Sequence, residues 1–515
     1  MMLAAPTAPP IQAPSIAYHA LWPILIVLIA ACVGVLIEAF VPRAERFSIQ
    51  VGLTTASLLG AFIAVCVLHG TSLTTVGGAV AVDGTGLFIQ GSILILAIMS
   101  VMLISERAIE VSPIVAQAAV VVGSPRDREL QRSNRIQTEI FPLALFAVGG
   151  MLIFPISNNL LLMFVALEVL SLPLYLMAGM ARRRRLLSQE AAVKYFLLGA
   201  FASAFFLYGL ALLYGYANSV DLPAILASAQ NSTKSDVLLY MGLALLIVGL
   251  LFKAGIAPFH SWTPDVYQGS PTAVTAFMAS CTKIAAFGAI LRVLYVGFAT
   301  TNWDWRPLMW AVAIASMVVG AVFGLTQTDV KRILAYSSIA HAGFILVGVI
   351  ALSKSGISST LFYLVTYGFS TLAAFGLLTL VRDADGEATR LSQWSGLARK
   401  SPVVAGLMTL FLLSMAGIPL TSGFVGKFAV FSAAYHDAAP LVVIALIASA
   451  VAAFFYLRIV VLMYWADPPE NAPTIAIPSP ATTFALTVGA LVTIVLGLFP
   501  QPVLDLASHA ATLHG

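Results

Sequence analysis

Runs of about 20 predominantly apolar residues recur along the whole chain, and they constrain its fold more than any other feature. A helix of that length spans the hydrocarbon core of a bilayer, so each run predicts a transmembrane helix. Only 9% of the residues are charged, against roughly 25% in soluble domains. The sequence therefore predicts an all-α polytopic membrane protein rather than a soluble enzyme, and the net charge of +4 does not imply a nucleic-acid partner.

Fourteen apolar runs are long enough to count as spans. We predict them at residues 18–40, 49–68, 86–105, 140–157, 159–180, 190–216, 236–259, 270–298, 307–326, 331–352, 356–381, 402–436, 438–464 and 482–503. The first run is not a signal peptide, because its first flanking basic residue, Arg43, lies on its far side.

The distribution of Lys and Arg predicts the orientation of these spans. With the N-terminus outside, cytoplasmic loops and helix ends hold 17 basic residues, external loops hold 3, and 6 lie inside spans. Positive residues accumulate on the cytoplasmic side, so both termini are expected outside. On this topology Arg182 to Arg185 anchor a cytoplasmic boundary, and the charged stretch 106–139 is a cytoplasmic loop that can hold a short helix.

Two segments repeat a Gly-Ile-Pro pattern beside a lysine. Lys253 is followed by Gly255 and Pro258, whereas Pro419 precedes Lys427. Pro removes a helix hydrogen bond and Gly loosens the backbone, so spans 7 and 12 are predicted to be discontinuous. Spans 7 and 12 are five apart. Because this offset is odd, the two copies cross the membrane in opposite directions, which predicts two inverted five-helix repeats, spans 4–8 and 9–13. The expected domains are 1–138 (spans 1–3 and the loop), 139–298 (first repeat), 299–465 (second repeat) and 466–515 (last span).

Charged and titratable side chains lie inside several spans. A charge at bilayer depth costs at least about 2.5–3.5 kcal/mol, so such residues are functional candidates. A series of them on different helices of one bundle suits a proton relay. The candidates are Glu168, Lys194, Lys253, Lys283, His341 and Lys427.

These residues also have structural interpretations. The charges could form ion pairs that hold helices together, Lys194 could extend to the interface, and His341 could be a packing residue. We expect Arg292 and Arg458, near span ends, to extend to the interface. His260 and Asp265 lack the further ligands of a metal site, and the three cysteines form no CxxC, so neither a metal nor a cofactor is expected in this chain.

Three segments resemble a known family. These are 167–175 (LEVLSLPLY), 252–267 (FKAGIAPFHSWTPDVY) followed by SPT at 270–272, and 329–341 (DVKRILAYSSIAH). They are similar to the antiporter-like subunits L, M and N of proton-pumping NADH-quinone oxidoreductase, respiratory complex I. Lys427, where subunit M typically has Glu, and the lack of a long lateral helix after the last span favour the subunit N branch.

The resemblance implies a proton-translocating membrane-arm subunit in a bacterial inner membrane. Glu168 would pair with Lys253, and His260, Asp265, Pro258 and Pro419 would support the relay. NADH, FMN, iron–sulfur clusters and quinone would bind partner subunits, and subunits M, K and J and the lipid bilayer would be the neighbours. A subunit of a multisubunit cation/proton antiporter is the alternative function, and a membrane scaffold with unused charges is a third.

Overall fold

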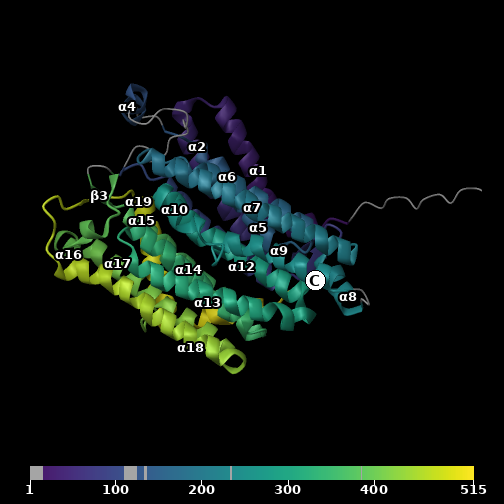
Figure 1. Ribbon diagram of the computed structural model, residues 1–515. Helices are drawn as coiled ribbons and strands as arrows, with labels where there is room; N and C mark the ends of the chain where they lie inside the picture. Colours follow the sequence, from purple (N-terminus) through teal and green to yellow (C-terminus); the bar gives the residue numbers. More distant parts are fainter. Residues whose placement is uncertain (1–14, 110–123, 133–135, 232–234, 384–385, 515) are drawn as a thin grey trace, which may run out of the picture.

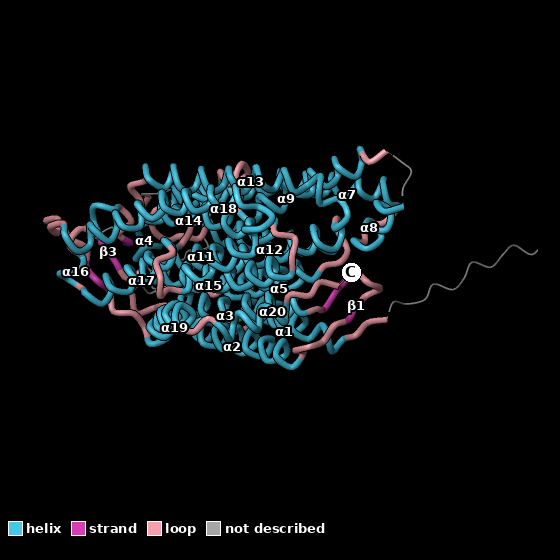
Figure 2. The backbone as a smooth tube through the Cα atoms, turned by 90° about the horizontal axis from the view of Figure 1, so that it is seen from below, coloured by secondary structure: helices cyan, strands magenta, loops and turns pink. Residues whose placement is uncertain are grey.

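The computed structural model describes residues 15–109, 124–132, 136–231, 235–383 and 386–514. Twelve helical segments are long and apolar enough to cross a membrane, and two shorter apolar helices, Ile140–Ile156 and Pro402–Ala416, accompany them. The long helices run side by side in two perpendicular views (Figures 1 and 2). This confirms an all-α multi-pass membrane protein.

The N-terminal part contains three long helices and a hairpin. Its elements are α1 (Tyr18–Phe40), α2 (Arg43–Val67), β1 (Leu73–Thr75), β2 (Val80–Val82), α3 (Gly84–Ile104) and α4 (Pro125–Arg132). Strands β1 and β2 pair antiparallel, with Thr74 opposite Ala81. Helix α4 lies in the expected loop 106–139, whose residues 110–123 and 133–135 are outside the described part. Helix α2 starts six residues before the predicted span, because Arg43 and its polar neighbours continue the helix past the apolar run.

The middle part carries most of the candidate residues. It comprises α5 (Ile140–Ile153), η1 (Phe154–Ile156), α6 (Leu160–Ala178), α7 (Arg185–Ala217), α8 (Leu222–Asn231), α9 (Val237–Ala254), α10 (Trp262–Gly269), α11 (Thr272–Phe277), the π-helical turn η2 (Met278–Thr282), α12 (Lys283–Arg292), the π-helical turn η3 (Val293–Gly297) and η4 (Ala299–Thr301). Short α8 was not expected, because its ten residues are too few to form a span.

The C-terminal part contains the remaining helices. They are α13 (Asn302–Thr326), α14 (Val330–Ile350), α15 (Lys354–Leu378), β3 (Val381–Asp383), β4 (Gly386–Glu387), η5 (Leu391–Trp394), α16 (Leu397–Lys400), α17 (Pro402–Ala416), α18 (Ser422–Trp465), β5 (Thr474–Ile475), α19 (Pro480–Leu498) and α20 (Gln501–Ala510). Strand β3 pairs antiparallel with both β4 and β5, and Arg382 lies opposite Glu387 and Thr474. The helix predicted at 482–503 ends at Leu498, because Pro500 interrupts it and α20 starts afterwards.

Helix α18 is bent back on itself. Ala438 has non-helical φ and ψ angles of −146° and 38°. Lys427 and Ser449 are 22 residues apart, which is about 33 Å along a straight helix. Their side chains nevertheless form a hydrogen bond of 2.8 Å between Nζ and Oγ, so the chain reverses direction near Ala438.

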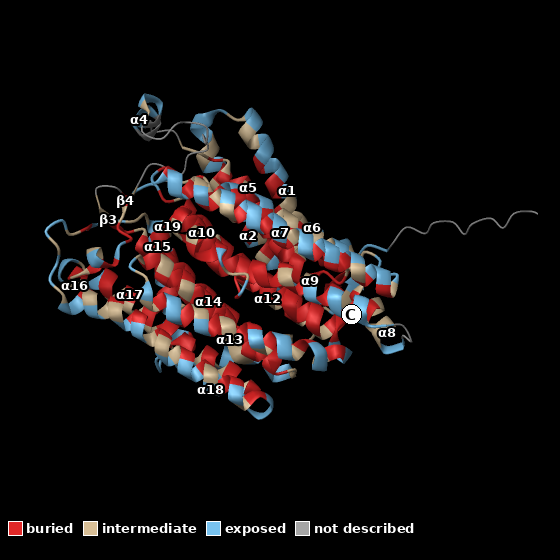
Figure 3. Ribbon diagram, viewed as in Figure 1, coloured by how far each residue is buried: buried red, intermediate tan, exposed pale blue. Residues whose placement is uncertain are grey.

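The helices that carry Lys283 and His341, together with α15, form the centre of the bundle. The apolar windows of Thr272–Gly297 and of α15 are 100% buried within the chain and that of α14 is 94% buried, whereas those of α1, α2, α7 and α19 are 39% buried. The buried residues therefore concentrate in the middle of Figure 3, and the outer helices expose apolar side chains. Polar groups on the central helices are shielded from lipid by protein.

The expectation for Arg292 was wrong. Its guanidinium is fully buried and forms an ion pair of 2.7 Å with Asp83, which is also fully buried. Arg292 Nε also donates to the carbonyl of Pro155 at 2.6 Å, and Nη1 donates to the carbonyl of His514 at 3.1 Å. The side chain therefore points into the bundle, because Asp83 provides a carboxylate there. Arg458 is partly buried and donates to the carbonyl of Leu325 at 3.2 Å.

Candidate functional site

Two helices are broken where the Gly-Ile-Pro patterns lie. Helix α9 ends at Ala254, and the chain becomes helical again at Trp262, after Pro258 and His260. Helix α17 ends at Ala416, and α18 starts at Ser422, after Pro419. Gly255 and Gly417 follow the helix ends with φ of +69° and +85°, a left-handed conformation that favours glycine. Non-helical backbone at membrane depth needs a protein or polar surrounding. Ile256 and Ala257 of the first break are buried within the chain, whereas Ile418 and Leu420 of the second are exposed on its surface.

Four titratable side chains of the prediction are almost completely buried. The exposed fractions are 3% for Lys253, 3% for Lys283, 2% for His341 and 5% for Lys427. A lysine in such a place must be satisfied by hydrogen bonds, since an unpaired buried charge is costly. The partners of each side chain therefore indicate how its charge is held.

Lys253 lies in the last turn of α9, just before the first break. Its Nζ donates to Ser171 Oγ of α6 at 2.9 Å and to Tyr195 OH of α7 at 3.2 Å. The Tyr195 ring stacks on Trp262, the first residue of α10, with centroids 4.5 Å apart. Both partners are neutral hydroxyls, which hydrogen-bond to an ammonium without neutralising it.

Glu168 lies one turn before Ser171 on α6. No ion pair within 4.0 Å joins it to Lys253 among the described residues, and its Oε1 is buried without a hydrogen-bond partner. The carboxylate is still close enough for its charge to act on Lys253. Glu168 and Lys253 are therefore neighbours without direct contact, and Ser171 and Tyr195 take two of the three donors of the lysine.

Lys283 begins α12, directly after the π-helical turn η2. Its Nζ donates to the backbone carbonyl of Ser338 on α14 at 2.6 Å and lies 5.5 Å from the centre of the Tyr367 ring on α15. π-Helical turns are rare and are frequent at functional sites. Lys283 therefore connects the middle part of the chain to α14 and α15.

His341 lies between Lys283 and Lys427. Its Nδ1 is 2.8 Å from Tyr363 OH, and its Nε2 is 3.3 Å from Tyr456 OH. The imidazole ring is next to Tyr367, which Lys283 also contacts, and next to Phe344, which Lys427 contacts. The charges of both lysines act on His341. The three predicted residues therefore form one cluster.

Lys427, on α18, binds the end of α17 across the second break. Its Nζ donates to the carbonyls of Met415 and Ala416, both at 2.9 Å, and to Ser449 Oγ at 2.8 Å. The two carbonyls are at the C-terminal end of α17, where a helix has unpaired acceptors and a partial negative charge. A Cβ atom at Gly417 would lie 2.9 Å from Lys427 Cδ, so glycine is needed there for close contact.

Lys194 belongs to a second cluster. Its Nζ forms ion pairs of 2.6 Å with Glu190 and with Asp265, and Asp265 forms another of 2.7 Å with Arg332. The Lys194 side chain is 40% exposed, far more than the other candidate lysines. Asp265 on α10 thus joins α7 to α14, away from the buried cluster of Lys283, His341 and Lys427.

No group of three or more His, Cys, Asp or Glu side chains that could hold a metal ion occurs in the described ranges. His260 lies in the first break and is partly exposed, and Asp265 is held by cations. These two residues therefore do not meet in a common ligand set.

Lys331 and the tyrosines around His341 were not among the predicted site residues. Lys331 is one of the 17 basic residues assigned to the cytoplasmic side. It is nevertheless only 3% exposed, and its Nζ donates to the carbonyl of Ser270 at 2.8 Å. Tyr363, Tyr367 and Tyr456 are buried as well. The available signal was the density of hydroxyl side chains in α14 and α15, which is unusual for helices that face only lipid.

A bundle with two broken helices and a buried series of protonatable groups defines an ion-translocating membrane protein of the transporter class. The family NADH:quinone oxidoreductase/Mrp antiporter, transmembrane region, matches residues 157–453. NADH-quinone oxidoreductase subunit N of Saccharopolyspora erythraea is 58% identical over 507 residues, which cover 97% of this chain and 98% of the relative.

Two solved structures have the same fold. A chain of respiratory complex I from Thermus thermophilus is 34% identical with a TM-score of 0.77, covering 94% of this chain and 99% of that chain. A chain of the Mrp complex from Dietzia sp. has a TM-score of 0.81 at 21% identity, covering 96% and 97%, and shows the fold alone. The chain described here belongs to the family of NADH-quinone oxidoreductase subunit N.

Proposed function

We propose that protons cross this subunit along Glu168, Lys253, Lys283, His341 and Lys427. The chain is a proton-translocating membrane-arm subunit of NADH-quinone oxidoreductase, a bacterial multi-pass membrane protein. The observation that supports the route is the cluster in which Tyr367 lies between Lys283 and His341, and Phe344 lies between His341 and Lys427. Buried lysines can exchange protons, since burial disfavours their charged form and opposing charges restore it.

The first step of the route depends on Glu168. A carboxylate near Lys253 favours its ammonium form, and movement of the carboxylate away favours proton release. Because the two side chains do not form a tight ion pair, a small displacement of α6 changes their interaction. Glu168 would thus control when Lys253 gives its proton toward Lys283.

The supporting residues have separate roles in this proposal. Pro258 and Pro419 keep the breaks non-helical, and His260 lies in the first break. Lys194 and Asp265 connect α7 to α10, so they would transmit changes at the surface of the bundle to the first break.

We also propose fourteen crossings in two inverted five-helix repeats, with both termini outside. This number follows when α18 is divided at Ala438 and its first half is joined with α17 into one broken span. A break beside a lysine in each repeat supports the repeats. The excess of basic residues in one set of loops supports the orientation.

The orientation can be tested by cysteine labelling in intact cells. Cys32 and Cys66 are first replaced by Ser, because both are exposed on the chain surface. An impermeant thiol reagent should label Lys354→Cys and fail to label Arg399→Cys until the membrane is opened. Both native side chains are exposed. Labelling of Arg399→Cys alone in intact cells would reverse the orientation.

The subunit is expected to function only within an assembled complex. We propose that subunits M, K and J are its neighbours in the membrane, and that NADH, FMN, iron–sulfur clusters and quinone bind elsewhere in the complex. Gentle solubilisation and purification through this chain should therefore yield flavin and iron–sulfur absorption. A preparation that contains only membrane subunits and exchanges cations for protons without NADH would instead support the antiporter alternative.

A further inference from the structure

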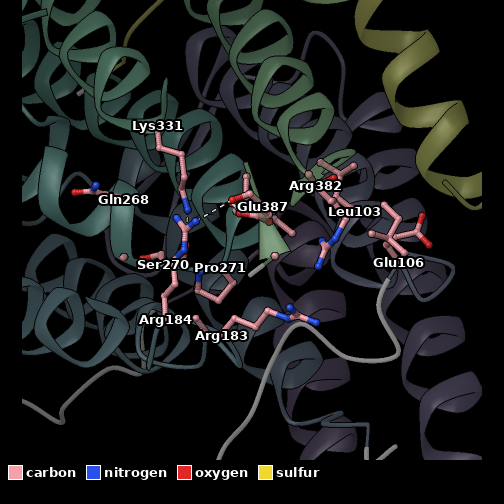
Figure 4. A pocket seen from close by; sticks show the side chains of 17 residues that line it. Leu103, Glu106, Arg183, Arg184, Gln268, Ser270, Pro271, Lys331, Arg382 and Glu387 are labelled. Atoms are coloured by element: carbon pink, nitrogen blue, oxygen red, sulfur yellow. Dashed lines mark hydrogen bonds between the residues drawn. The ribbon is translucent and has the colours of Figure 1, made fainter. Parts of the chain in front are cut away.

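A cavity of about 90 Å³ lies where α3, α10, α11, α14 and the hairpin of β3 and β4 meet. Its charged lining residues are Glu106, Arg183, Arg184, Lys331, Arg382 and Glu387. Lys331, Arg184 and Glu387 point toward one another on one side of it (Figure 4). Arg183 and Arg184 belong to the boundary segment that our orientation places in the cytoplasm. The cavity therefore opens toward the side from which protons are taken up.

Lys331 is the buried cation of this lining. Its exposed fraction is 3%, whereas Arg183 and Arg184 are exposed. The Nζ atom donates to the carbonyl of Ser270, and no ion pair of Lys331 within 4.0 Å occurs among the described residues. The charges of Glu387 and Asp329 favour its ammonium form, and that of Arg184 opposes it. A lysine held mainly by neutral partners can both lose and regain a proton.

The carboxylates of the cavity are already engaged. Glu106 accepts hydrogen bonds from the backbone of Ala108 and from Ser479, and Glu387 accepts one from Thr272. Burial alone would raise the pKa of Glu106, but its hydrogen bonds outweigh that effect and hold the pKa below its ordinary value. Glu106 thus stays ionised and structural, which leaves Lys331 as the buried group that can take up a proton.

A group of buried hydroxyls leads from Lys331 toward Lys283. Ser338 lies two helical turns after Lys331 on α14, about 10.5 Å away along the axis. We call the hydroxyls near it the hydroxyl cluster, and it consists of Tyr267, Ser338, Tyr367 and Thr371. The side chains of the cluster lie close to one another. Lys283 binds the backbone of Ser338 and faces the Tyr367 ring, so the cluster ends at Lys283.

The cluster is arranged to hold water. Ser338 Oγ, Tyr367 OH and Thr371 Oγ1 are buried and within reach of one another, but none of them forms a hydrogen bond of good geometry within the described residues. Ser270 Oγ, next to Lys331, also lacks such a partner. Buried polar groups that lack protein partners are normally satisfied by internal water. Water bridging these hydroxyls would supply a hydrogen-bonded path.

We propose that Lys331 is a proton-uptake residue of this chain, and that it supplies Lys283 through the hydroxyl cluster by a branch that joins the route from Lys253 at Lys283. The Lys331 ammonium would give a proton to internal water beside Ser270, further water would carry it to the hydroxyl cluster, and an N–H bond would form on neutral Lys283 at the other end. The neutral Lys331 amine then takes a proton from water in the cavity. This proposal rests on the proposed function and orientation.

The test uses the purified complex in sealed vesicles, with proton uptake driven by NADH and followed by a fluorescent pH probe. Lys331→Arg keeps the charge but cannot release the proton, since the pKa of arginine stays above about 12. We expect uptake to fall at least about tenfold, the lower range of what a positioned proton-transfer group contributes. Proton uptake by Lys331→Met should fall equally. Lys331→His should recover part of the uptake rate, because imidazole titrates near neutral pH.

Lys400→Met is the matched control, because this lysine lies on the same side of the membrane and is exposed. Flavin content per complex reports assembly for every variant. Normal uptake by Lys331→Arg, or no recovery by Lys331→His over Lys331→Met, would overturn the proposal. If the proposed function itself were wrong, Lys253→Ala and Glu168→Gln would also pump normally. If only the role of Lys331 were wrong, these two variants would still lose pumping.

Discussion

Replacing Lys427 by Arg is expected to stop proton pumping although the positive charge is retained. Lys427 Nζ is held by the carbonyls of Met415 and Ala416 and by Ser449, a set of neutral acceptors that suits an ammonium and tolerates its loss. Arginine cannot release a proton near neutral pH. NADH-driven proton uptake in sealed vesicles should fall at least about tenfold, while the flavin content of the complex is unchanged.

Lys400→Arg makes the same chemical change at an exposed lysine and should pump normally. If Lys427→Arg assembled and pumped at the wild-type rate, Lys427 would supply only a fixed charge at the end of α17. The final step of the route toward the outside would then be elsewhere. Because the Cβ position of Gly417 is only 2.9 Å from Lys427 Cδ, the larger guanidinium also tests how tightly the break is packed. Lys427→Gln removes the amine with a smaller side chain, so loss of pumping in both variants would show that crowding is not the cause.

Glu168→Gln and Lys253→Ala are each expected to reduce proton pumping about tenfold or more with assembly intact. Glu168→Gln removes the negative charge that acts on Lys253 and leaves the shape of the side chain almost unchanged. Lys253→Ala removes the proton-carrying group and leaves Ser171 and Tyr195 to bond with water. Proton uptake and quinone reduction should be measured together, because a block in the membrane arm slows both in a tightly coupled complex.

The double variant Glu168→Gln/Lys253→Ala provides the sharper result. If the carboxylate acts through the lysine, the double variant should lose no more activity than Lys253→Ala alone. Fully additive losses would show that Glu168 acts independently of Lys253. Glu190→Gln is a suitable control, because this exposed carboxylate pairs with Lys194 rather than with the buried lysines.

Apolar runs and the two Gly-Ile-Pro patterns were sufficient to predict a membrane bundle and its breaks. The runs are visible in the sequence because a helix in lipid must satisfy its backbone internally and present apolar side chains over its whole length. Gly255 and Gly417 marked the breaks because only glycine readily adopts their positive φ angles. The intramembrane charges were equally visible, since each is costly and therefore rare.

Which charges come together depends on helix packing, and no sequence spacing contains that information. The sequence grouped Lys194 with Lys253, but α7 places Lys194 at the bundle surface beside Asp265. It placed Arg292 at the interface, but Asp83, 209 residues away in the chain, binds it inside the bundle. Lys331 is the first residue of a predicted span, but α14 places its buried side chain in the lining of a cavity. A span boundary shows where a helix meets the membrane surface, whereas only the neighbouring helices decide whether a side chain there faces water, lipid or protein.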